Sequence, residues 1–329
     1  MSSAIGCLLC NLARLSKKVL IPLFSILTLL LSFNTLAANG PDNAGRADYD
    51  FDDNGLIEIN DLADLDEIRN NLDGKTLYGS NVGCPDAEDG AVNGGCVGFE
   101  LTADLDFDTD GNGVVDNEDD YRNITQEGIA RGWKPIGNYG QRISFSSVFN
   151  GNGYVIENLT ISRPTSNSVG LFGYIENARI ESVVIAGPNS SIVGSSGAAG
   201  LVGHAGYNSI IRNVAVIANV TGNTRVGGLI GGIVSKTQIE NSFSSGSVSG
   251  NAWVGGLVGL SSDHSNLAYA SSINSTFSTA VVTGITGNVQ IGGLIGLLGN
   301  VDVISNSYWA KDVSGRSYSA GRSEANRYV

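Results

Sequence analysis

The sequence predicts a mainly β protein: a right-handed parallel β-helix (solenoid), preceded by a small acidic region that contains one helix. Three observations predict it. A Gly-Leu-x-Gly tetrad returns five times from residue 170 onward, short runs of Val, Ile, Ser and Thr lie between turn residues, and carboxylates gather before the repeats. Self-similarity at a fixed period is typical of solenoids, and the residue types within each period favour strands and turns.

The first 37 residues have the order of a secretory signal peptide. Arg14, Lys17 and Lys18 precede an apolar run from Val19 to Leu31, and Thr35-Leu36-Ala37 is an acceptable cleavage triplet. An uncleaved membrane anchor is the alternative, but this apolar run is shorter than the roughly 20 residues that span a bilayer. We therefore expect a signal peptide over 1–37, export to the extracellular space or the cell surface, and no transmembrane span after cleavage.

Charge divides the rest of the chain. The 329 residues include 32 carboxylates and 19 Lys and Arg, a net charge of -13. This balance argues against a nucleic-acid partner, whose phosphates need a basic surface. Of the carboxylates, 23 lie between Asn39 and Tyr121 and only six between Trp133 and Ala310. The predicted regions are an acidic region over 38–131, a repeat region over 132–310 and a polar tail over 311–329.

Two stretches of the acidic region share one spacing, with oxygen side chains at positions 1, 3 and 5, Gly at 6 and Asp at 12. Calcium takes six to eight oxygen ligands, and loops of this spacing, with a backbone carbonyl at position 7, supply them. The candidate ligands are Asp50, Asp52, Asn54, Leu56 and Asp61 in the first loop and Asp108, Asp110, Asn112, Val114 and Asp119 in the second. Solvated acidic turns are the alternative, but the recurrence favours two Ca²⁺ sites. The terminal Asp resembles the calcium loops of bacterial extracellular modules such as dockerins, which implies structural calcium.

Apolar residues recur at three- and four-residue intervals behind the first loop, at Leu62, Leu65, Ile68 and Leu72. This periodicity predicts one amphipathic helix of about three turns that ends before Gly74, with Asn60 or Asp61 as its N-cap.

Cysteine use is consistent with export. Cys7 and Cys10 lie in the leader, whereas Cys84 and Cys96 lie in a Gly- and Asp-rich stretch of the acidic region. In an oxidising compartment this pair is expected to form a disulfide. A two-cysteine metal site is the alternative, but no His lies nearby to complete it.

The tetrads define the repeats. They begin at Gly170, Gly200, Gly228, Gly256 and Gly293, and an Asn follows the later four, at Asn213, Asn241, Asn274 and Asn306, with Ser182 in its place in the first repeat. We expect each repeat to form one coil, with Leu, Ile and Val inside and Asn in ladders at the turns. Gly in each tetrad is expected where the backbone approaches the next coil.

These tetrads resemble the GLUG motif of bacterial secreted and surface proteins. Three upstream segments also resemble the sequence that commonly precedes such repeats: Gly132-Trp-Lys-Pro-Ile-Gly137, Phe149-Asn-Gly-Asn-Gly153 and Ile156-x-Asn158-Leu-x-Ile161. The resemblance covers about residues 132–310. It implies an extracellular β-helical repeat of adhesin-like proteins, and it implies no reaction.

No convergent catalytic set is visible in the sequence, so a non-enzyme is expected, with no catalytic residues and no small-molecule cofactor. Glu157, Glu181 and Glu240 each precede the coil Asn or its substitute, which predicts one solvated outward row. We expect adhesion, matrix contact or scaffolding, with extracellular glycans or matrix and surface proteins as partners. The alternative is a carbohydrate-binding protein or a lyase- or glycosidase-like β-helix enzyme, and the latter would need facing carboxylates.

Overall fold

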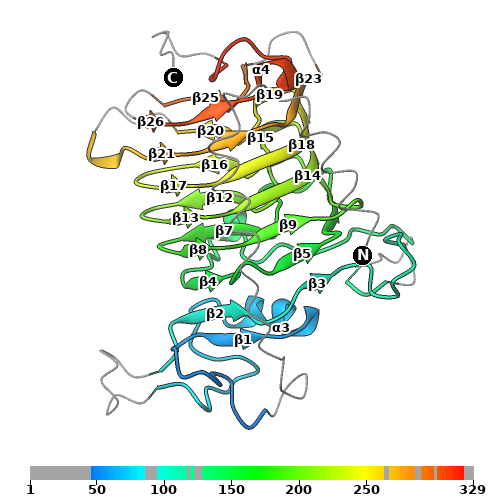
Figure 1. Ribbon diagram of the computed structural model, residues 1–329, viewed down its shortest axis with the longest axis vertical. Helices are drawn as coiled ribbons and strands as arrows, with labels where there is room; N and C mark the ends of the chain where they lie inside the picture. The colour runs from blue at the N-terminus through cyan, green and yellow to red at the C-terminus, as the bar shows by residue number, and fades with distance from the viewer. Residues whose placement is uncertain are drawn as a thin grey trace, which may run out of the picture. The chain divides into compact units, whose positions relative to one another are not determined.

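The computed structural model describes residues 46–85, 95–116, 119–121, 128–262, 267–285, 290–299 and 302–321. The predicted signal peptide lies outside these residues. The described residues form one compact unit, in which short parallel strands stack coil upon coil (Figure 1). The predicted parallel β-solenoid is confirmed.

One face of the solenoid is an eight-stranded sheet. Its order is β1 (Ile57–Ile59), β2 (Gly98–Leu101), β4 (Val148–Asn150), β8 (Arg179–Glu181), β13 (Ile210–Arg212), β17 (Gln238–Glu240), β21 (Ser272–Asn274) and β26 (Val303–Ser305). One residue of each strand stacks in register with its neighbours, from Ile57 through Phe99 and Phe149 to Ile304. All but the last are fully buried, so they form a column of apolar side chains inside the coils.

The acidic region contributes the first rungs of this sheet. β2, from the acidic region, pairs with β4 of the repeat region, and β1 pairs with β2. The acidic region is therefore continuous with the solenoid in its hydrogen bonding. Long insertions separate its strands in sequence, which hides the period there.

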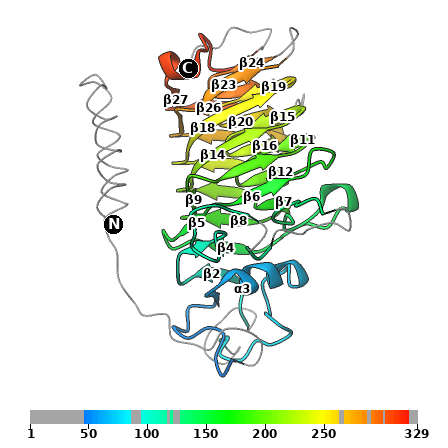
Figure 2. The same ribbon diagram turned by 90° about the vertical axis from the view of Figure 1, so that its right-hand side faces the viewer.

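Three further sheets complete the coils. A ten-stranded sheet contains β3 (Leu105–Asp106), β5 (Val155–Glu157), β9 (Val184–Ala186), β14 (Ala215–Thr221), β18 (Phe243–Gly250), β22 (Phe277–Ser278) and β27 (Tyr308–Trp309), with β6 (Thr160–Ser162), β10 (Ser191–Val193) and β23 (Val281–Gly284) beside them. A five-stranded sheet contains β7 (Phe172–Glu176), β12 (Val202–Gly206), β16 (Ile230–Ile233), β20 (Val258–Ser261) and β25 (Ile295–Leu297). A four-stranded sheet contains β11 (Ser196–Ala198), β15 (Thr224–Gly227), β19 (Ala252–Gly255) and β24 (Ile291–Gly292), and Figure 2 shows these strands one above another.

The tetrad glycines lie where neighbouring coils approach each other. A Cβ added to Gly228 would lie 2.4 Å from the carbonyl oxygen of Gly256, the first glycine of the next tetrad. A Cβ on Gly231 would lie 2.6 Å from the carbonyl carbon of Gly197 in the preceding coil. Both distances are too short for a side chain, and Leu229 between these glycines is fully buried. The predicted role of the tetrads is confirmed at these positions.

The residues that follow the strands of the eight-stranded sheet form left-handed corners. Asn213, Asn241 and Asn306 have φ between 47° and 55°, a region that Asn tolerates better than most residues. The prediction of Asn274 for this position is wrong, because β21 ends on Asn274 and Ser275 takes the corner with φ 53°. Of the predicted residues, Asn306 still donates to Asn274 at 3.1 Å. Amide pairs also occur at other corners, where Asn208 donates to Asn177 at 3.0 Å and Asn251 donates to Asn223 at 2.9 Å.

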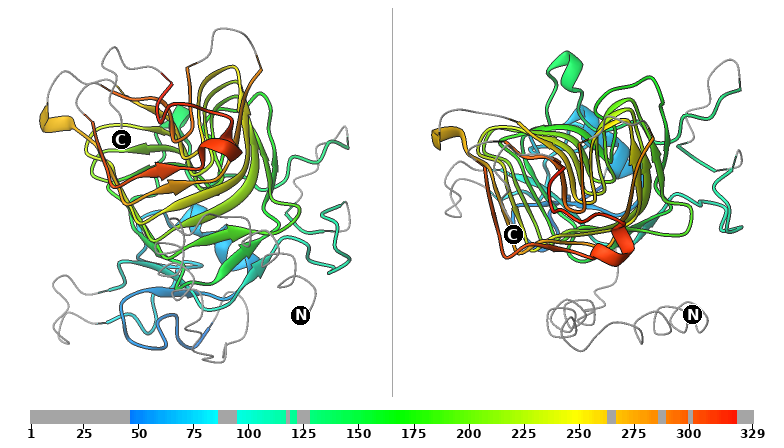
Figure 3. Two further views of the ribbon diagram at one scale, coloured as in Figure 1. Left: turned by 45° about the horizontal axis from the view of Figure 1, so that its top comes forward. Right: turned by 90° about the horizontal axis from the view of Figure 1, so that it is seen from above.

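The predicted helix forms as α3 (Leu62–Glu67) and continues as the 3₁₀ turn η1 (Ile68–Asn70). Asp61 is its N-cap and accepts from the backbone N–H of Asp64 at 2.8 Å. Leu65 and Ile68 are fully buried in the same core as the strands, and along the stack the helix lies within the outline of the coils (Figure 3). The helix therefore covers the interior at the N-terminal end.

The other end is covered by the segment after β27. This segment begins with the short helix α4 (Lys311–Ser314), and the N–H groups of Leu294 and Ile295 in the last tetrad and β25 donate to Ser319. Trp309 lies against Gly293, and its indole donates to the carbonyl of Arg316 at 2.9 Å. The predicted polar tail thus pairs with the last coil as far as it is described. Two 3₁₀ turns, η3 (Tyr139–Gln141) and η4 (Leu267–Tyr269), lie in loops.

Candidate metal centres

The second predicted loop brings its carboxylates together. One carboxylate oxygen each from Asp108, Asp110 and Asp119 lies within 4.8 Å of the others. Asp119 is held in place by the N–H groups of Thr109 and Asp116, at 2.6 and 2.7 Å. The spacing from position 1 to position 12 therefore produces the convergence that the sequence predicts.

The same loop contains a buried oxygen with no donor. Asp108 Oδ2 accepts from the N–H of Gly113 at 2.7 Å, but Oδ1 is buried and has no hydrogen-bond partner. The side chain is about nine-tenths buried, since the residue is 8% exposed. Burial raises the pKa of Asp108, and the nearby charges of Asp106 and Asp119 act in the same direction. A cation would supply the partner that this oxygen lacks.

The first loop adopts the same hydrogen-bond pattern over positions 1 to 7. Asp50 Oδ2 accepts from the N–H of Gly55 at 2.8 Å, as Asp108 does from Gly113. Within each loop the position-5 amide donates to the position-3 carboxylate, and its oxygen accepts from the N–H of position 7. The corresponding residues are Asp52, Asn54 and Leu56 in the first loop and Asp110, Asn112 and Val114 in the second. The two sequences therefore fold locally in the same way.

The closing carboxylate of the first loop is not the predicted one. Asp61 caps α3, and the predicted ligand Asp50 lies with Cys84 and Cys96, so neither belongs to the group of converging carboxylates. That group consists of Asp52, Glu58 on β1 and Glu100 on β2, again within 4.8 Å of one another. Glu58 accepts from the N–H of Phe51 at 2.6 Å, the role that Asp119 plays toward Thr109. The carboxylate of this loop that converges with Asp52 is thus at position nine rather than twelve, and the neighbouring strand β2 supplies Glu100.

Ionising all three carboxylates of this group costs free energy, because Glu58 and Glu100 are buried and the charges of the group repel one another. Burial raises the pKa of Glu58 to about 7, and the charges of Asp50 and Glu100 contribute. Burial likewise raises the pKa of Asp50 and of Glu100, although Asn54 and Asn152 donate to Glu100 at 2.9 and 2.7 Å. Oxygen ligands that destabilise one another's charge are suited to a hard divalent cation.

The predicted disulfide is confirmed. Cys84 and Cys96 are bonded, with their Cα atoms 5.1 Å apart. They lie close to Asp50, but sulfurs joined in a disulfide are not thiolate ligands. The bond therefore fastens the segment beside the first loop and removes the alternative of a two-cysteine metal site.

Among the described residues of the repeat region, no three carboxylates converge in the same way. The predicted single row is wrong for Glu157, which lies on β5 in register with Ala186 and Asp106. Glu181 and Glu240 do share a row, with Arg212 between them. Arg212 pairs with Glu181 at 2.5 Å. Asp263, the sixth carboxylate of this region, lies outside the described residues.

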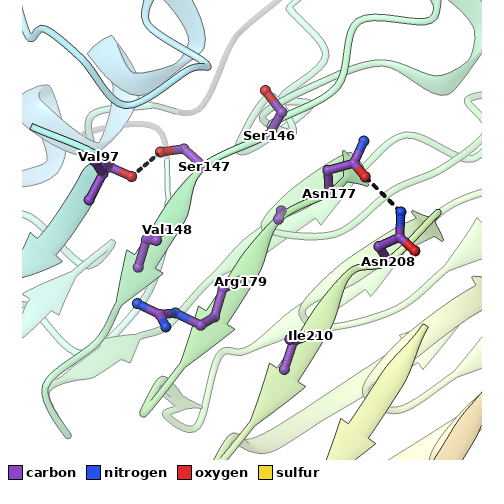
Figure 4. Close-up of a pocket in the computed structure, with 9 residues that line it drawn as sticks. Val97, Ser146, Ser147, Val148, Asn177, Arg179, Asn208 and Ile210 are labelled. Carbon is purple, nitrogen blue, oxygen red and sulfur yellow. Dashed lines mark hydrogen bonds between the residues drawn. The ribbon is translucent and has the colours of Figure 1, made fainter. Parts of the chain in front are cut away.

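The surface of the coils also contains a shallow hollow of about 340 Å³, lined by both apolar and polar residues. It lies across the starts of β4, β8 and β13, and Figure 4 shows the amide of Asn208 donating to Asn177 at its edge. Arg179, the charged residue in its lining, pairs with Glu181 at 3.5 Å. The charge of this hollow is thus balanced. No helix within the described ranges is long and apolar enough to cross a membrane.

Comparison with known proteins supports the repeat. The family described as the GLUG motif matches residues 222–249, which include β15, β16, β17 and most of β18. A protein of Evansella cellulosilytica, named as a candidate Gly-rich membrane protein, is 36% identical over 86 residues, 26% of this chain and 10% of that protein. This chain thus spans about a tenth of that relative's length.

A solved structure supports the fold. The crystal structure of a candidate immunoglobulin A1 protease from Bacteroides ovatus matches with a TM-score of 0.50 at 18% identity, and the match covers 78% of this chain and 76% of that one. At this identity the likeness concerns the fold alone. Together with the tetrad geometry, these matches show that the chain carries a GLUG motif at residues 222–249, within a parallel β-solenoid.

Proposed function

We propose that the chain is an exported surface or extracellular solenoid that holds two structural calcium ions and acts by binding, in adhesion, matrix contact or scaffolding, without catalysing a reaction. The observation that carries the calcium part is Asp108 Oδ1, buried without a donor where Asp110 and Asp119 converge. A buried carboxylate oxygen without a partner costs free energy, and coordination of a cation recovers it.

Two ligand sets follow. In the second loop, Asp108, Asp110 and Asp119 would hold the ion, with the Asn112 side chain and the Val114 carbonyl completing an oxygen cage. In the first loop, Asp52, Glu58 and Glu100 would hold it. Because Glu58 lies on β1 and Glu100 on β2, this ion of the first loop would link the two adjacent strands.

The non-catalytic role is supported by the repeat region. Among its described carboxylates, Glu157 lies on β5, Glu181 pairs with Arg179 and Arg212, and the buried Asp302 accepts from the N–H of Ser271 at 2.7 Å. Glycoside cleavage needs two carboxyl groups facing each other across the bond. The protease named in the structural comparison suggests peptide cleavage as the competing function, and a turnover assay with protein and polysaccharide substrates would detect either activity.

Export is supported by the predicted leader and by the disulfide, since disulfides persist in oxidising compartments. Adhesion or scaffolding is the role that the GLUG motif favours, and the stacked coils offer an extended surface for it.

Calorimetric melting of the full chain in calcium or in EGTA tests the proposal. Calcium at about 100 times its Kd stabilises by roughly 2.7 kcal/mol per site, so we expect a clear rise in Tm. Asp110→Asn should remove a large part of that rise, whereas Asp312→Asn, an exposed carboxylate in α4, should retain it. An equal Tm in calcium and EGTA, or an undiminished rise in Asp110→Asn, would refute the calcium sites.

A further inference from the structure

A second hollow, of about 290 Å³, lies where the N-terminal helix meets the repeats. Three segments line it: the end of the helix with Arg69, the loop from Lys134 to Ile143, and the turn from Arg163 to Val169. These segments are far apart in the sequence, and the hydrogen bonds of Arg69 to the carbonyls of Lys134 and Pro135, at 2.9 and 3.4 Å, hold two of them together.

The hollow gathers positive charge on an acidic protein. Arg69 pairs with Asp66, but Lys134 and Arg163 have no carboxylate partner among the described residues. Arg163 is fixed in place, since its Nε donates to the carbonyl of Trp133 at 3.0 Å. Its pKa is lowered by burial and then by the charges of Arg131 and Arg69. Cations that repel one another in a partly buried site are stabilised by an anion.

This excess of charge distinguishes the hollow from the one in Figure 4. There, the cation Arg179 is balanced by Glu181. Here, two cations remain to be neutralised, in a chain whose net charge is -13. An anionic group therefore binds more favourably in the hollow beside the helix than in the other hollow.

The rest of the lining indicates what carries the anion. The side chains of Asn138, Gln141, Ser166 and Asn167 offer amides and hydroxyls, the groups that exchange hydrogen bonds with sugar hydroxyls. The volume is just below the roughly 300–1,000 Å³ typical of ligand sites, which suits a single ring. None of the lining residues belongs to a β-strand, so a peptide could not add to a sheet edge here.

We infer that this hollow binds a carboxylate-bearing sugar residue of an acidic glycan, with Lys134 and Arg163 facing the carboxylate and the amides holding the ring. The inference rests on the binding role proposed above and names its ligand. It is independent of the calcium loops, whose effect is read from melting.

The test is calorimetric titration of the full chain with a hyaluronan hexasaccharide, which contains glucuronate, and with cellohexaose as a neutral chain of the same length. We expect binding of the acidic chain alone, weakening as salt is added. Lys134→Gln should weaken it about tenfold, because a hydrogen bond to a charged group is worth about 1.5 kcal/mol or more. Lys134 is exposed, so the variant should melt as the parent does. Lys311→Gln, an exposed lysine in α4, is the matched control and should bind unchanged.

Several outcomes would overturn the inference. They are equal binding of cellohexaose, unchanged affinity in Lys134→Gln, equal or tighter binding of poly-L-glutamate, or inorganic sulfate binding as tightly as the hexasaccharide. Absence of binding to hyaluronan would also overturn it. If melting still depended on calcium in that case, the proposed calcium-stabilised structure would be retained and only the proposed glycan ligand would be refuted.

Discussion

The column of apolar residues inside the coils gives a direct prediction for stability. Ile211 on β13 is fully buried and stacks in register between Ile180 and Ile239. Ile211→Ala removes three carbons, and at about 0.8 kcal/mol per buried CH₂ the transfer term is about 2.4 kcal/mol. The cavity between two rigid neighbours adds to this, so we expect a loss of about 3–4 kcal/mol in the free energy of unfolding.

Urea unfolding followed by far-UV circular dichroism, in calcium, measures this loss. Ile217→Ala on β14 is the matched control, because this isoleucine is 43% exposed, and it should cost less than about 1 kcal/mol. Coils stabilise one another through their shared interfaces, so the damage at Ile211 should lower the midpoint of the main transition. Equal losses in the two variants would refute the stacked interior column.

Three other predictions follow from the backbone, a buried histidine and the disulfide. Gly228→Ala should destabilise by about 1–3 kcal/mol because its Cβ would meet the next coil, whereas Gly140→Ala, whose nearest atom lies 3.4 Å away, should be nearly neutral in the same urea assay; equal effects would contradict the close approach. Burial lowers the pKa of His204 from 6.5 to about 4, so the folded state disfavours its proton, and about 3 kcal/mol of stability should be present above pH 6.5 and lost as the pH falls toward 4. Comparing unfolding of the parent and His204→Leu across this range isolates the effect, and identical pH slopes would argue against it. Reduction of the Cys84–Cys96 disulfide should cost about 3 kcal/mol for a loop of this length, measured as the shift in the urea midpoint; an unchanged midpoint would show that the bond contributes little.

Much of the fold is visible in the sequence because the repeats are local. The tetrad at Gly228 has copies 28 residues before and after it, and the first glycines at Gly200, Gly228 and Gly256 each lie close to the first glycine of the next tetrad. The helix of the acidic region is equally local, since its cap Asp61 and its apolar stripe lie within a few turns. Patterns of this kind can be recognised in the sequence because the residues that form them lie close together along the chain.

Features that depend on register across coils were not predictable. Insertions between Ile57, Phe99 and Phe149 hide the period in the acidic region, although Ile-Glu-Ile and Phe-Glu-Leu have the alternation of half-buried strands. Glu100 reaches the first loop only through the pairing of β2 with β1, which no local spacing encodes.

Two further features of the sites could not be read from the local sequence. Asp61 has the right residue type both for a loop ligand and for a helix cap, and the start of α3 decides between them. The hollow beside the helix brings together Arg69, Lys134 and Arg163 from three segments far apart in the sequence, so no sequence motif predicts it.

Calcium in the acidic loops is the central functional claim, and equilibrium dialysis of the full chain against radioactive calcium tests it most directly. We expect two ions per chain, and one each in Asp110→Asn and Glu100→Gln, which alter different loops. Retention of two ions in both variants, or no bound calcium in the parent chain, would contradict the claim.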